Sequence, residues 1–102
     1  MHWTLLWFIT RQLWLFPQVM HLSGRFEIVS LVGTLNEDAH LHVSLSDAEG
    51  NTVGGHVLGD LEVFTTAEVV IGDAVDLLFT REMDEQTGFP ELVVHPRLET
   101  DK

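Results

Sequence analysis

The sequence predicts a single domain built mainly as an antiparallel β-sheet or barrel-like sheet, with little helix. First, short runs of β-branched and apolar residues recur after Gly24, and each run ends at a turn rich in Gly, Asp or Asn. Second, 102 residues suit one domain, and a hydrophobic fraction of 45% is enough for a core. Third, the absence of cysteine excludes disulfides and thiolate metal sites, and it favours a reducing, cytoplasmic setting.

Residues 1–22 form an atypical hydrophobic segment that holds all three tryptophans of the chain. Its apolar stretch is shorter than the about 20 residues of a membrane span, and Arg11 and Gln12 interrupt it. It also lacks the basic start and cleavage site of a signal peptide. We therefore expect it to pack on the core or on another subunit, with no membrane association. A truncated or mis-assigned start is the alternative, and any helix is expected here.

The expected strands follow in order at residues 25–35, 40–46, 53–58, 61–71, 76–83 and 91–95. Turn-forming residues separate them at 36–38, 47–51, 72–73 and 84–88. The acidic cluster of Glu82, Asp84 and Glu85, at the last of these turns, lacks the spacing of a calcium-binding loop. We accordingly place the folded domain at residues 23–95, followed by a polar tail at 96–102.

The most distinctive chemical feature of the sequence is a trio of histidines. Because strand side chains alternate, His40 and His42 share the face opposite Leu41, Val43 and Leu45. A three-residue loop at 48–50 would pair His42 with His56, with their Cβ atoms about 5 Å apart. Three neutral imidazoles would then converge on zinc or another divalent transition metal ion.

Two alternatives to this metal site stay open. A four-residue loop would shift the register by one and send His56 to the other face. The histidines could also be ordinary surface or interface residues bonded to neighbours and water. Glu27 and Glu68 are candidate carboxylates nearby, or else exposed strand residues paired with Arg25 or Arg81. We find no nucleophile motif and no clear general base, so the sequence names no catalytic residue and no reaction.

The net charge of -11 bears on nucleic acid binding. Non-specific DNA affinity comes from Lys and Arg that neutralise phosphates, and the five basic residues here are scattered. Direct DNA binding by this domain alone is therefore disfavoured.

Several stretches resemble the plants and prokaryotes conserved (PPC) domain, also called the PD1-like DNA-binding family, in its prokaryotic form. They are GRFEIVSLVGT at 24–34, HLHVSLSD at 40–47, VGGHVLG at 53–59, TTAEVVIG at 65–72, FTRE at 79–82, TG at 87–88 and ELVV at 91–94. The resemblance covers roughly residues 22–94. It implies an α+β fold on an antiparallel sheet, a homotrimer and a DNA-binding label.

Some features of the chain depart from the wider family. Plant relatives carry an AT-hook before the domain, and this chain has no such hook. The three histidines are typical of the prokaryotic branch. Because 23 residues precede Gly24, fewer than is usual for the family, we expect an N-terminally truncated or divergent member. Two functions remain: an oligomeric, non-enzymatic binding or regulatory module, or a metal-dependent enzyme or small-molecule sensor that uses the histidines.

Overall fold

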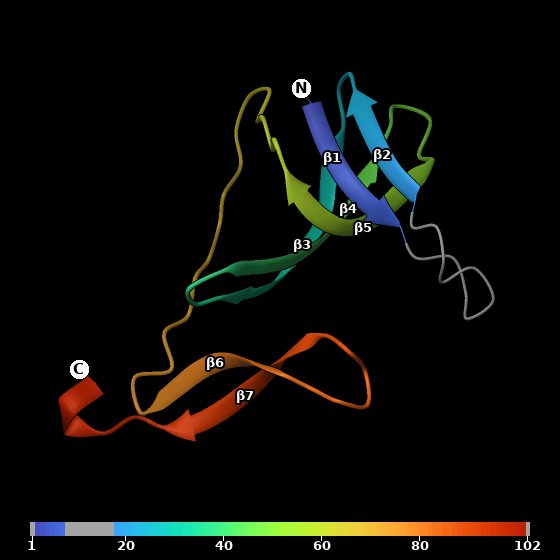
Figure 1. Cartoon of the computed structure of the whole chain (residues 1–102). Helices are drawn as coiled ribbons and strands as arrows, with labels where there is room; N and C mark the ends of the chain where they lie inside the picture. Colours follow the sequence, from blue (N-terminus) through green and yellow to red (C-terminus); the bar gives the residue numbers. More distant parts are fainter. Residues whose placement is uncertain (1, 8–17, 102) are drawn as a thin grey trace. The chain divides into compact units, whose positions relative to one another are not determined.

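A computed structural model of the chain describes residues 2–7 and 18–101 (Figure 1). Its elements are β1 (His2–Trp7), β2 (Gln18–Ser23), β3 (Glu27–Leu35), β4 (Ala39–Ser46), β5 (Thr52–Gly59), β6 (Leu77–Met83), β7 (Pro90–Pro96) and the short 3₁₀ turn η1 (Glu99–Asp101). All strand pairs are antiparallel. The predicted class, mainly antiparallel sheet with little helix, is therefore confirmed. The described residues form two units: residues 2–7, 18–35 and 39–68 belong to the first, and residues 36–38 and 69–101 belong to the second.

The first unit is a five-stranded sheet in the order β2-β1-β5-β4-β3 (Figure 1). Its core lies on one face of β4, where Val43 and Leu45 are 2% and 0% exposed. Partly buried apolar side chains from the other strands and loops pack against them: Met20, Leu22, Phe26, Leu31, Val53, Val57 and Leu61. Because side chains alternate along a strand, this core forces the histidines of β4 onto the opposite face.

Asp47 organises the loop between β4 and β5. Its backbone N–H donates to the carbonyl of Asn51 at 2.9 Å, and its carboxylate accepts from the backbone N–H groups of Glu49 and Asn51 at 3.0 and 2.8 Å. The Asn51 side-chain amide also donates to it, and these hydrogen bonds lower the pKa of Asp47. Gly50 has a φ of 86°, the left-handed conformation that the three-residue loop requires. The predicted loop is therefore confirmed.

Gly54 allows β4 and β5 to approach closely. A Cβ at this position would lie against the backbone carbonyl oxygen of Val43, and 3.2 Å from the Oγ of Ser44. Only glycine fits this contact without a shift of the backbone.

The described parts of the N-terminal segment, residues 2–7 and 18–22, lie in strands of the sheet. β1 pairs with β2 on one side and β5 on the other, so both of its edges are hydrogen-bonded. Met20 and Leu22 of β2 face the core, as the expected packing of this segment requires. Residues 8–17 lie outside the described part of the chain. The helix expected in this segment is not found in its described residues, and the one helical turn described is η1, near the C-terminus. No helix in the described ranges is long and apolar enough to cross a membrane.

The prediction of a strand at residues 61–71 is wrong. The described chain has no strand between Gly59 and Leu77. Leu61 packs on the core, but Val69, Val70 and Ile71 are 63%, 98% and 70% exposed. These β-branched residues favour an extended backbone, but a strand also needs a neighbour for its backbone hydrogen bonds. No described strand supplies one.

The second unit is the hairpin of β6 and β7, with Phe79 opposite Val94 and Met83 opposite Pro90. The acidic cluster forms the predicted turn, because the Asp84 carboxylate accepts from the backbone N–H groups of Gln86 and Thr87. His95 lies within β7, where its Nε2 is 3.1 Å from Glu82 and 3.2 Å from the Thr80 hydroxyl.

Candidate metal centre

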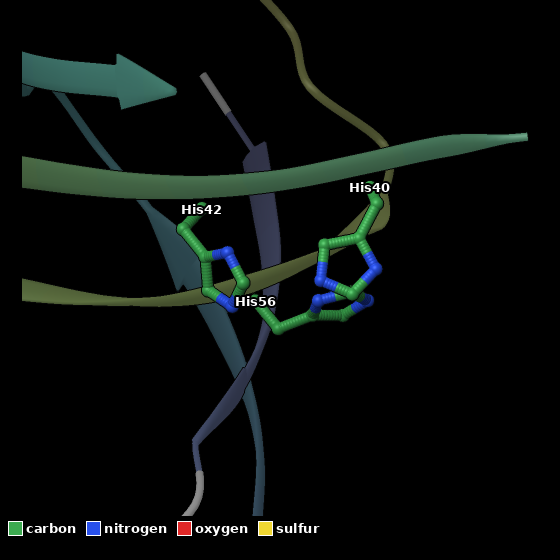
Figure 2. Close-up of side chains that lie close together, drawn as sticks. All are labelled: His40, His42 and His56. Carbon is green, nitrogen blue, oxygen red and sulfur yellow. The ribbon is translucent and has the colours of Figure 1, made fainter. Parts of the chain in front are cut away.

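His40, His42 and His56 come together on the face of the sheet opposite the core (Figure 2). The register places His42 directly opposite His56, as the loop arithmetic predicts, so the register that sends His56 to the other face is excluded. The ring centroids of His40 lie 5.2 Å from His42 and 4.8 Å from His56, and those of His42 and His56 are 5.2 Å apart. One hairpin therefore carries the whole trio.

The ring orientations suit ligands to one ion. The rings are inclined to one another by 54°, 75° and 72°, so their edges meet and their faces do not stack. A set of ligand nitrogens, one from each ring, lies within 4.8 Å of one another. Tetrahedral zinc with Zn–N bonds near 2.05 Å needs nitrogens about 3.3 Å apart. Small rotations of the imidazole side chains would close this difference, so the residues fit a metal ion.

The surroundings of His56 favour its neutral form, which is the form that binds a metal ion. Burial lowers the pKa of His56 below its ordinary value, and the neighbouring His40 and His42 lower it further. A protonated imidazole cannot bind a metal ion, so a lowered pKa keeps His56 ready to do so. His42 is exposed, while His40 and His56 are half-buried. The trio is thus open to solvent on one side.

The two candidate carboxylates do not join the histidines. Glu27 pairs with Ser46, at the other end of β4. Glu68 lies with Glu27 along a separate cavity, and among the described residues the cluster that could hold a metal ion contains the three histidines alone. Sequence reasoning could not place these residues, because the segment that carries Glu68 leaves the sheet.

That cavity, of about 660 Å³, is a feature that sequence reasoning missed. It lies in the first unit and is lined by residues 25–28, 46–48 and 63–68. At its side the guanidinium of Arg25 lies over the Phe64 ring, 4.2 Å from the centroid. Nothing in the spacing of Arg25 and Phe64 signals this contact.

Comparison with known proteins decides the family. The family model of the plants and prokaryotes conserved (PCC) domain matches residues 4–75. The chain belongs to this PCC family. A solved structure with the same fold is that of a hypothetical protein from Salmonella cholerae-suis, with a TM-score of 0.84 and 35% identity. The match covers 95% of this chain and 67% of the Salmonella chain. The resemblance on which the family was expected is therefore confirmed.

The chain spans a small part of the length of the curated relatives that it matches. The chain is 43% identical over 76 residues to the bifunctional protein GlmU of Synechococcus sp. (strain JA-2-3B'a(2-13)). It is 33% identical over 66 residues to the AT-hook motif nuclear-localized protein 8 of Arabidopsis thaliana. These matches cover 74% and 56% of this chain, but 12% and 17% of the two relatives.

Proposed function

We propose that this PCC domain is an oligomeric, non-enzymatic binding module that holds a divalent transition metal ion on His40, His42 and His56. The observation that carries the proposal is the convergence of the three imidazoles on one face of the β4–β5 hairpin. Three histidines supply three ligands of a tetrahedral ion and leave one position for water or another ligand. Zinc is the first candidate, although imidazole-only sites select weakly among such metals.

Metal analysis of the protein tests this proposal. The chain is purified without a His tag, dialysed against zinc and then against metal-free buffer, and its zinc content is measured by mass spectrometry. We expect about one zinc per chain in the wild type, and loss of most of it in His42→Ala. The matched control is His21→Ala, which removes an exposed histidine of β2 and should retain the metal. A wild type without zinc, or a His42→Ala protein with full zinc, would reject the site.

We propose a homotrimer as the oligomeric form. The number of three subunits is what the resemblance to prokaryotic PCC domains implies. The exposed apolar side chains support association of the chain with another surface. Large exposed apolar patches mark interaction surfaces. In the described chain the exposed apolar side chains include those of the consecutive residues Val69, Val70 and Ile71.

A second candidate function is a part in DNA-associated regulation, favoured by the relative named for its AT-hook and nuclear location. Charge argues against direct contact with phosphates: the net charge is -11, Arg25 lies over Phe64 and Arg97 lies 3.9 Å from Asp73. We therefore expect no measurable binding to duplex DNA at physiological salt in a fluorescence anisotropy titration. Binding that weakens steeply as salt rises would overturn this expectation.

A further inference from the structure

We propose that the metal-loaded histidine site takes a small organic carboxylate as its exchangeable fourth ligand. This inference rests on the metal site proposed above and names the chemical class of its ligand. Its first support is the donor set, since three imidazoles bind as neutral ligands and leave a divalent ion with its full double charge. A cation in this state favours an anionic oxygen in the open position.

Strands β3, β4 and β5 place no carboxylate beside the trio. Within β3, β4 and β5 the one acidic residue is Glu27, and it sits opposite Ser46 rather than beside the histidines. Register and strand alternation give the trio neutral neighbours instead: Ser30, Val32, Thr34 and Ser44. The nearest acids along the chain, Glu37 and Asp38, lie in the turn before β4. An external anion therefore meets no carboxylate of these strands at the ion.

The neighbours also indicate which anion fits. Val32 lies opposite His42, so the two side chains share the histidine face. Val32 is 69% exposed, which leaves apolar surface beside an exposed ligand position. A carboxylate with a short hydrocarbon tail can bind the ion with its head and cover this surface with its tail. A fully polar oxyanion such as phosphate lacks the second contact.

The overall negative charge does not prevent this binding. The acidic residues are spread along the chain, and salt screens charges beyond about 8 Å at physiological ionic strength. The metal ion acts on its ligand at bond distance, where neither salt nor water intervenes. The local double charge therefore outweighs the diffuse negative field.

The experiment uses protein loaded with Co²⁺, whose visible absorption reports both metal uptake and a change of ligand. Acetate, butyrate and phosphate are titrated separately at constant ionic strength. We expect a saturable spectral change with the carboxylates and tighter binding of butyrate than of acetate. Stronger binding of phosphate than of butyrate would point to a general oxyanion site and overturn the carboxylate assignment.

An internal competitor sharpens the test. Val32→Glu places a carboxylate opposite His42, and we expect its Co²⁺ spectrum to resemble that of the acetate-bound wild type, with at least about tenfold weaker acetate binding. The matched control Val32→Gln has the shape of the glutamate without its charge. It should keep the wild-type response to acetate and lose part of the preference for butyrate, because its side chain is polar. Uptake of Co²⁺ with no response to any carboxylate would sink this inference and leave the metal site standing. No uptake of Co²⁺ would reject the metal site and this inference together.

Discussion

His56 makes the stability of the metal-free protein depend on pH. Burial and the two neighbouring imidazoles lower its pKa in the folded chain. Above the ordinary histidine pKa of about 6.5, His56 is neutral in both states and contributes nothing to the pH dependence. As the pH falls below that value, the unfolded chain takes up the proton more readily, so the free energy of unfolding decreases.

We therefore expect metal-free protein to be less resistant to urea at pH 5.5 than at pH 7.5, with a smaller difference in His56→Asn. Urea denaturation at both pH values, in the presence of a chelator, measures this. Identical pH dependence in the two proteins would contradict the role of His56.

Gly54 is the residue at which a single methyl group should disturb the hairpin. An alanine Cβ there would press on the carbonyl oxygen of Val43, which belongs to rigid backbone. We expect Gly54→Ala to lower the free energy of unfolding by about 1–3 kcal/mol. Gly72→Ala is the matched control, because its Cβ would meet no atom within 4 Å, and it should change stability by less than about 0.5 kcal/mol. Equal stability of the two variants in urea denaturation would refute the close-contact argument.

At the scale of the element, the core face of the β4–β5 hairpin holds its register. Inserting one glycine between Ala48 and Glu49 lengthens the loop to four residues and still allows His42 to pair with His56. A shift of the pairing by one residue would instead turn Val53 and Val57 out of the core, because side chains alternate with period two. We therefore expect this variant to keep most of its zinc by mass spectrometry. Loss of the zinc would show that the loop length, and not the core, sets the register.

The same hairpin was predictable from sequence because its information is local. Strict alternation from His40 to Ser46 and the left-handed Gly50 fix both the face and the register. The insertion of β1 beside β5 was not predictable, since that pairing joins Leu6 to His56, two residues that lie far apart in the sequence. The strand predicted at residues 61–71 was wrong for the opposite reason. Their composition favours a strand, but local composition does not reveal whether a neighbouring strand is available.

For the whole molecule, association of copies must overcome the charge of -11 on each chain. Salt screens repulsion between like charges, whereas apolar contacts do not weaken with salt. We expect the proposed trimer to dissociate at a lower protein concentration in 500 mM than in 50 mM NaCl. Analytical ultracentrifugation across a dilution series measures this, and a trimer that weakens with added salt would argue for ion pairs between subunits.

The exposed apolar residues give a second test at this scale. Val70 is 98% exposed in the single chain, so Val70→Asp should not disturb its fold. If Val70 lies in a contact between copies, the new charge is buried without a partner, and we expect the trimer to dissociate at least about tenfold more readily. Gln86→Asp adds the same charge in an exposed loop and is the control. Equal trimer content of both variants would remove Val70 from the contact.

The placement of all three histidines between residues 40 and 56 has a consequence for how the domain is made. A short hairpin forms in microseconds, long before distant strands such as β1 and β5 find each other. We therefore expect the three ligands to come together early in folding, on one contiguous stretch of chain. Such a stretch can be kept or lost in evolution as one unit, while the other strands complete the sheet and its core.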